Sequence, residues 1–176
     1  MSTGIKYFVS ICFFLMLFIG KNEKTFSQDK DYKAYTLFLY NFMKYIEWPE
    51  EANEFVIGIA GESPIQKELL ALSEVKKIKG KKIVVKIISS AEEASSCSMV
   101  YIPSSKSSML KLIAEKTKGK PVLIVAEREG LAKKGAAISF VVDEDDTLKF
   151  DLNKSALESQ TLKAANLLIQ LGIMVG

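Results

Sequence analysis

The sequence predicts an α/β domain with a mainly parallel sheet of about four strands, an added antiparallel hairpin, and helices on both faces of the sheet. Four short apolar runs alternate with segments of helical spacing, which is typical of a parallel sheet covered on both sides. After Gly135 the pattern changes to alternating large and small or polar residues, which favours an antiparallel pair. The chain of 176 residues, 48% of them hydrophobic, is long enough for one such core.

The first segment is predicted to be a signal peptide, residues 1–27. Residues 7–20 form an apolar run behind Lys6, and a polar stretch with small residues follows before Gln28. The run is shorter than the roughly 20 residues that a membrane span needs. We therefore expect cleavage near residue 27, a single domain over residues 28–176 and a periplasmic location, with an uncleaved anchor or a lipoprotein as the alternatives.

The first element after this segment is predicted to be a helix over residues 30–47, because apolar side chains recur there at the spacing of one helical face and Pro49 stops the run. A buried strand is expected at Phe55–Ala60. A helix of about ten residues should follow the Ser63–Pro64 pair, which has the sequence of a helix start. The lysine-rich residues 76–82 are expected to form a loop.

Three more strands are expected in the middle of the chain. They are the β-branched run Ile83–Ile88 and the apolar runs Met99–Ile102 and Pro121–Ala126. Helical spacing at Ser107–Lys118 predicts a helix between the last two strands.

The end of the chain predicts a hairpin and then one helix. Residues 138–142 and 148–152 alternate in polarity, and an acidic tip lies between them. Ser155 and Glu158 have the spacing of a capping box, which predicts a final helix that packs against the first one and ends the chain.

Composition excludes several classes of function. The chain has no histidine, and its two cysteines, Cys12 and Cys97, supply neither an imidazole base nor an ordinary metal or haem ligand set. Arg128 is the only arginine in a chain of net charge +3, whereas nucleic-acid recognition relies on arginine forks. We expect no catalytic residue, no metal, no cofactor and no nucleic-acid partner.

Aromatic residues are concentrated in the first predicted helix. Seven of the eleven aromatic residues that follow residue 27 lie between Tyr32 and Trp48, more than one buried helical face requires. Tyr40, Lys44 and Tyr45 are therefore expected on the exposed side, where they would contact a protein partner. Packing of all the aromatic side chains in the core is the alternative. The residues expected to face inward are Phe38, Phe42 and Ile46.

Two loops at the carboxyl ends of predicted strands are candidates for a small-ligand site. Gly61 and Ser63 follow one strand, Ser104 and Ser105 follow another, and together they would line a crevice of the kind that α/β sheets use for ligands. A simple helix cap explains Ser63 equally well. The lysines of residues 76–82 are either a solvated loop or a contact for an acidic partner or lipid headgroups.

Several segments resemble a known family in both order and spacing. LYNFMKYIEWP at Leu39–Pro49 resembles the opening motif of the YfiR-like family of exported proteins. The other similar segments are GESP at Gly61–Pro64, the segment around Cys97, PVLIVAE from Pro121, Gly135–Phe140, and KFDLN at Lys149–Asn153 before a leucine-rich end. The resemblance covers almost all of residues 32–173.

This resemblance implies a non-enzymatic periplasmic regulator in cyclic di-GMP signalling. Such a protein binds and restrains the periplasmic domain of a membrane signalling protein, such as a diguanylate cyclase or a sensor kinase, and meets the membrane only through that partner; a homodimer is left open. Redox-regulated relatives have paired thiols, whereas Cys97 has no partner after residue 27, so we expect a buried small hydrophobe there, with a reactive or intermolecular thiol as the alternative. A small-ligand binding protein is the alternative function.

Overall fold

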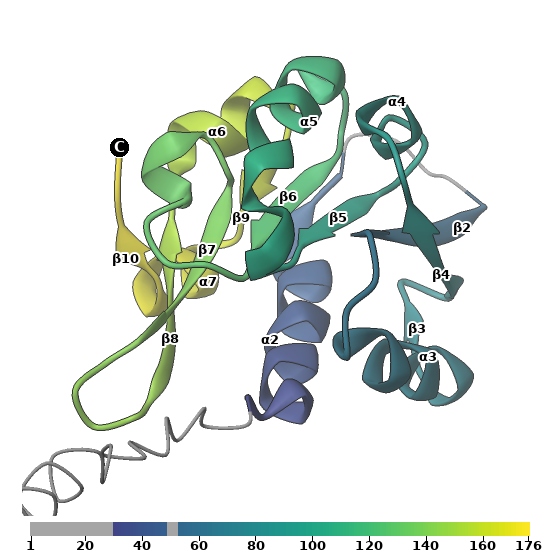
Figure 1. The fold of residues 1–176 in the computed structure, drawn as a ribbon, viewed down its shortest axis with the longest axis horizontal. Helices are drawn as coiled ribbons and strands as arrows, with labels where there is room; N and C mark the ends of the chain where they lie inside the picture. Colours follow the sequence, from purple (N-terminus) through teal and green to yellow (C-terminus); the bar gives the residue numbers. More distant parts are fainter. Residues whose placement is uncertain (1–29, 49–52) are drawn as a thin grey trace, which may run out of the picture. The chain divides into compact units, whose positions relative to one another are not determined.

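The computed structural model describes residues 30–48 and 53–176, of which Asp31–Gly176 form one unit (Figure 1). The predicted signal peptide and its cleavage point lie outside the described residues. The helices are α2 (Tyr32–Tyr45), α3 (Ile65–Val75), α4 (Ala91–Ala94), α5 (Leu110–Thr117), α6 (Lys154–Ser159) and α7 (Asn166–Leu171), with 3-10 segments η1 (Ser104–Met109) and η2 (Ala132–Lys134). The strands are β1 (Ile46–Glu47), β2 (Glu54–Ala60), β3 (Lys77–Ile78), β4 (Lys81–Ile88), β5 (Met99–Ile102), β6 (Leu123–Ala126), β7 (Ile138–Val142), β8 (Leu148–Leu152), β9 (Lys163–Ala164) and β10 (Ile173–Met174).

The α/β class is confirmed, but the sheet is larger and more mixed than predicted. It has eight strands in the order β10-β8-β7-β6-β5-β2-β4-β3, and β1 pairs with β9 in a separate antiparallel sheet. The four predicted strands, β2, β4, β5 and β6, pair in parallel. The hairpin β7–β8 joins the same sheet through β6, and two-residue strands extend both edges. Strands of two residues are too short to show a period of two in the sequence, so the edges were not predicted.

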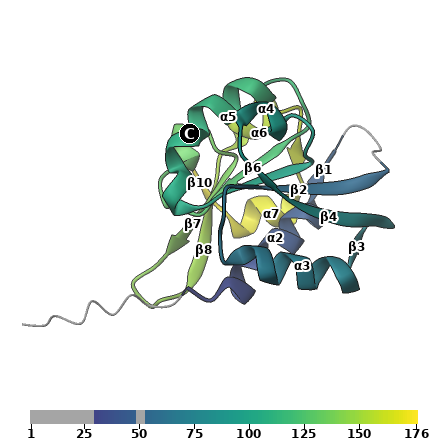
Figure 2. The same cartoon turned by 45° about the vertical axis from the view of Figure 1, so that its right-hand side comes forward.

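Helices cover both faces of the sheet, as predicted. Alternate residues along β2, β4, β5 and β6 supply two separate cores, because successive side chains point to opposite faces. One core packs against α2, α3, α6 and α7, and the other packs against α4 and α5. Figure 2 shows α4 and α5 on one side of the sheet and α2, α3 and α7 on the other.

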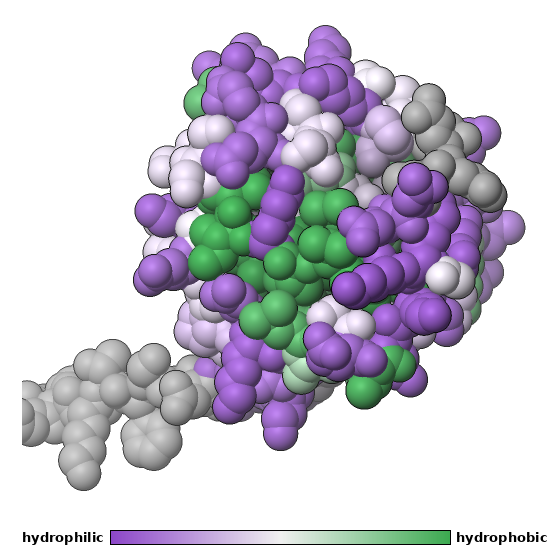
Figure 3. Space-filling model, turned by 90° about the vertical axis from the view of Figure 1, so that its right-hand side faces the viewer, coloured by the Kyte–Doolittle hydropathy of each residue, from purple (hydrophilic) through white to green (hydrophobic). Residues whose placement is uncertain are grey.

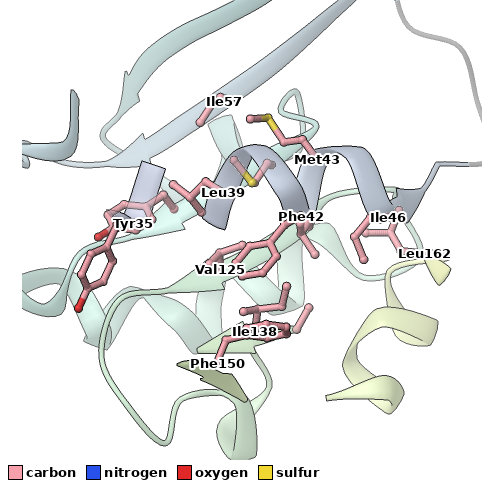
Figure 4. Packing of buried hydrophobic residues seen from close by; sticks show 14 of the residues in the cluster. Tyr35, Leu39, Phe42, Met43, Ile46, Ile57, Val125, Ile138, Phe150 and Leu162 are labelled. Carbon is pink, nitrogen blue, oxygen red and sulfur yellow. The ribbon is translucent and has the colours of Figure 1, made fainter. Parts of the chain in front are cut away.

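The first helix is anchored by aromatic packing (Figure 4). The Asp31 carboxylate accepts the backbone N–H groups of the first turn and so starts α2. The ring of Phe42, 1% exposed, lies 4.9 Å from the ring of Phe150 and 5.9 Å from that of Phe140. The helix ends at Tyr45 rather than at residue 47, because Ile46 turns into the extended conformation and pairs with β9.

The prediction of a single final helix is wrong. Two short helices, α6 and α7, are separated by Thr161, whose φ is 55°, and by β9. The cap of α6 is Asn153, whose Oδ1 accepts the Ala156 N–H at 2.9 Å, and not Ser155. Pairing of β9 with β1 and burial of Leu162 override the helical period, and the last element is the strand β10. The first and last helices, α2 and α7, do contact each other.

The lysine-rich segment is a tight hairpin rather than a loop. β3 and β4 are joined by Lys79 and Gly80, whose φ values are 48° and 82°. Positive φ at both central residues is the geometry of a two-residue type I′ turn. Lysine side chains therefore surround the start of β4.

Candidate interaction surface

The structure brings together the three residues expected to contact a partner. Tyr40 and Tyr45 are half-buried on α2, and the exposed Lys44 places its Nζ 5.7 Å from the centre of the Tyr40 ring and 5.4 Å from that of Tyr45. A lysine ammonium within about 6 Å of an aromatic ring is attracted by it. Each ring packs with one part against the core and leaves the other part exposed beside Lys44.

A fourth residue of this surface comes from another element and was not predicted. Lys76, which follows α3, lies with its Nζ 5.9 Å from the centre of the Tyr40 ring. No spacing in the sequence signals this approach, because it depends on the packing of α3 beside α2. We call Tyr40, Lys44, Tyr45 and Lys76 the tyrosine–lysine surface.

The inward side of α2 agrees with the expectation in part. Phe42 and Ile46 are each 1% exposed, whereas Phe38 is half-buried, with its ring edge-on to Phe140 and Phe150. Tyr35 and Leu39 also lie on the buried face of α2 and pack in the same core. The two tyrosines of the tyrosine–lysine surface are thus not needed to fill the centre of the core.

Trp48 closes the edge of the core beside β2. Its indole Nε1–H donates a hydrogen bond to the backbone oxygen of Ser98 at 3.4 Å. Its ring stands edge-on to Phe55, with 5.0 Å between the ring centres. Trp48 is half-buried, so it covers this end of the core with part of its ring exposed.

The two loops proposed as a ligand crevice do meet. A Cβ at Gly61 would lie only 2.8 Å from Cε of Lys106, so the segment after β5 passes directly over the turn after β2. The Ser63 Oγ is buried and has no hydrogen-bond partner among the described residues, whereas Ser105 is exposed. The Lys106 side chain therefore occupies the place between the loops where the serines were expected to face each other.

A buried carboxylate at the same sheet end was not predicted. Glu127 follows β6 and is 5% exposed. Its Oε2 accepts the Ser104 backbone N–H at 2.9 Å, and its Oε1 accepts the Tyr32 hydroxyl at 3.4 Å. Burial first, and the nearby Glu127 charge second, raise the pKa values of Tyr35 and Tyr101. The one signal in the sequence was the acidic residue directly after an apolar strand.

Two surface hollows lie away from both predicted sites. One of about 540 Å³ is lined mainly by apolar side chains of α6, β9, α7 and β10. The other, of about 360 Å³, is lined partly by Trp48, Phe55 and Cys97. Cys97 is a free thiol, 5% exposed, and burial raises its pKa. It fits tightly, because a Cβ at Gly58 would lie 2.7 Å from its Sγ, and so it is the buried small side chain that was expected.

Two searches of the described residues concern metals and membranes. Within residues 30–48 and 53–176, no three acidic or cysteine side chains gather closely enough to hold a metal ion. No helix in that part of the chain has the length and apolar character needed to cross a bilayer.

Comparison with known proteins gives a family. The YfiR/HmsC-like family model matches residues 32–172, more than half of the chain. A search among curated proteins found no match. The matched range begins at the first residue of α2 and ends at the glycine after α7, so it includes the tyrosine–lysine surface, both crevice loops and Glu127. The chain therefore belongs to the YfiR/HmsC-like family.

Proposed function

We propose that the protein is a non-enzymatic, exported regulator that binds the periplasmic domain of a membrane signalling protein, such as a diguanylate cyclase or a sensor kinase, and restrains it. Family membership supports a regulatory role. The tyrosine–lysine surface is the observation that supports binding through α2, with Tyr40, Lys44 and Tyr45 as the main contacts.

The geometry of this surface favours a protein partner. Tyrosine gives a large contact area with only two side-chain torsions to fix, so ordering it on binding costs little entropy. Tyr40 and Tyr45 are already restrained by the core on one side and by Lys44 on the other. Lys44 and Lys76 add positive charge at the rings, which favours an acidic patch on the partner.

The nucleophilic side chains of the described residues do not support catalysis. A reactive thiol needs a lowered pKa and access, whereas Cys97 is buried and its pKa is raised. The Ser63 hydroxyl has no described base in hydrogen-bond reach. At Ser104 the nearby carboxylate of Glu127 accepts the backbone N–H of that residue. These contacts favour structural roles.

Binding by purified protein tests this proposal. Residues 28–176 would be titrated by calorimetry with the periplasmic domains of the membrane cyclases and sensor kinases encoded in the same genome. One of these domains should bind, and Tyr45→Ala and Lys44→Glu should each weaken that binding at least tenfold. Lys111→Glu, an exposed charge change on α5, is the matched control and should have no effect. Binding at full strength by both α2 variants would place the contact elsewhere.

A small-ligand site is a second candidate, favoured by the buried, unpartnered hydroxyl of Ser63 beside the meeting loops. A ligand seated there would use Gly61, Ser63, Ser104 and Ser105, and it would displace the Lys106 side chain. A thermal-shift screen of small polar metabolites tests this function. A stabilising compound whose effect is lost in Ser63→Ala but kept in Lys111→Glu would support it, and the absence of any stabilising compound would count against it.

A further inference from the structure

One edge of the main sheet is open. β4 pairs with β2 from Lys82, opposite Glu54, to Ile88, opposite Ala60. On its other side it pairs only with the two residues of β3, through Lys81 and Lys82. The residues from Ile83 to Ile88 therefore form a free sheet edge within the described part of the chain.

The direction of the backbone groups on this edge follows from one hydrogen bond. The Ile88 carbonyl oxygen accepts the Gly61 N–H at 3.0 Å, so the backbone groups of Ile88 point toward β2. Groups alternate along a strand, so those of Ile83, Val85 and Ile87 point outward. Lys81 obeys the same alternation, because it pairs outward with Ile78. These three N–H and three C=O groups have no strand partner within the described part of the chain.

The side chains beside this edge leave it accessible. Val84 and Val85 are half-buried, and Ile87 is 37% exposed. Lys86 does not cross the edge, since its Nζ donates a hydrogen bond to Ser96 Oγ at 2.8 Å on one face of the sheet. Figure 3 views the side on which β4, β3 and α3 lie and shows apolar surface bordered by hydrophilic side chains. Such an edge is a template for another strand.

The charge around the edge is positive. The lysines of the β3–β4 hairpin and its approach form no ion pair with any described residue; they are Lys76, Lys77, Lys79, Lys81 and Lys82. The acidic groups on the elements packed against β4 are Glu54, opposite Lys82, Glu68 and Glu74 on α3, and Glu92 and Glu93 on α4 at the other end of the strand. A second copy paired antiparallel would place its apolar Ile88 end beside these lysines, and a parallel copy would bring two lysine sets together, which like charges disfavour. An acidic strand would be attracted.

We propose that the β4 edge binds an extended, acidic segment of the partner protein, which adds to the sheet as a strand beside Ile83–Ile88. This inference rests on the proposed function, because it names the chemistry of the partner. Main-chain hydrogen bonds to Ile83, Val85 and Ile87 supply the binding, and the lysines select acidic side chains.

The edge and the tyrosine–lysine surface adjoin. Lys76 lies between them, since its Nζ approaches the Tyr40 ring and it directly precedes β3, which pairs with the start of β4. One partner can therefore contact α2 with a folded surface and β4 with an extended segment. Two linked contacts bind more tightly than either alone because the second becomes intramolecular.

The test uses a seven-residue peptide of alternating glutamate and valine, labelled for fluorescence anisotropy, with its lysine counterpart as the control peptide. Val85→Pro removes one outward N–H, and Val85→Ala is the matched variant that shortens the side chain but keeps the N–H. The acidic peptide should bind Val85→Pro at least tenfold more weakly than Val85→Ala. Ile87→Pro against Ile87→Ala repeats the comparison near the strand end, should Val85→Pro fail to fold.

Three further readouts discriminate the possible results. Hydrogen exchange at the Val85 and Ile87 amides should slow when the acidic peptide binds, Lys82→Glu should weaken binding, and added salt should weaken it severalfold. Equal binding of the lysine peptide, or unchanged amide exchange, would overturn the proposal. A dimer of the wild-type chain by light scattering that Val85→Pro dissociates would assign the edge to a second copy instead.

Failure of this inference is separable from failure of the proposed function. If a periplasmic signalling domain binds Val85→Pro and Val85→Ala with equal affinity but does not bind Tyr45→Ala, the regulatory function stands and the edge site is wrong. If the acidic peptide binds as predicted while no such domain binds the protein, the edge site stands and the regulatory function is wrong.

Discussion

Two aromatic residues of one helix should respond in opposite ways to truncation. Phe42→Ala removes a ring that is 1% exposed and lies among three other rings, at 4.9 Å from Phe150, 5.9 Å from Phe140 and 6.0 Å from Phe38. Loss of such a buried ring costs about 3–5 kcal/mol. Each kcal/mol lowers the melting temperature of a domain of this size by about 2–4 °C, so the expected decrease is roughly 6–20 °C. Binding per folded molecule should change little.

Tyr45→Ala should have the converse effect. The Tyr45 ring is half-buried and its exposed part meets only Lys44 among the ring contacts described, so its removal should cost about 1 kcal/mol. Partner binding should nevertheless fall at least tenfold. Thermal unfolding by circular dichroism and calorimetric titration on the same samples separate the two effects. A decrease in melting temperature for Tyr45→Ala equal to that for Phe42→Ala would show that Tyr45 is a core residue and would refute the assignment of this surface.

Three other measurements test the structure. Trp48→Phe keeps a ring edge-on to Phe55 but removes the hydrogen bond to Ser98, and it should lower the free energy of unfolding in urea by about 1 kcal/mol; no change would mean that this bond is not formed. Tyr101→Phe removes a buried hydroxyl beside the Glu127 carboxylate, so it should lower the free energy of unfolding at pH 7 by about 1 kcal/mol, and unchanged stability would mean that no hydrogen bond joins the two groups. Burial raises the pKa values of Cys97 and Tyr101 above their ordinary 9.0 and 10.0, so at high pH the folded state keeps protons that the unfolded chain releases. The free energy of unfolding should therefore be constant with respect to these two groups below pH about 9 and should decrease as the pH rises further. This decrease should be less steep in Tyr101→Phe.

The sequence predicted the long elements well because their patterns are local. The helix at Tyr32–Tyr45 and the strands containing Phe55–Ala60 and Ile83–Ile88 each have a clear apolar period, and the structure forms all three. Elements of two residues gave no such signal, so β9 and β10 were not predicted. The final helix failed for the opposite reason, since its apolar period was good but Leu162 is more favourably buried when the chain breaks there and β9 pairs with β1.

The residues of the candidate site also divide into those that a local sequence pattern predicts and those that only packing between elements brings into place. Tyr40 and Lys44 lie four residues apart on one helix and Tyr45 follows Lys44 directly, so their proximity followed from one element. Lys76 and Glu127 reach their positions only through packing between elements, and a single sequence contains no direct record of that packing. The crevice was predicted from the rule that loops after parallel strands lie at one sheet edge, and the loops do meet, but the rule does not specify which side chain fills the space.

The antiparallel pair β1–β9 has a consequence for how the chain reaches its folded state. Ile46 pairs with Ala164, and α2 packs beside α7. The first elements of the described chain therefore reach their final packing only with residues more than 100 positions later in the sequence. Contacts of such large sequence separation form late and slow folding. A growing chain cannot finish this core until nearly all of it has been synthesised.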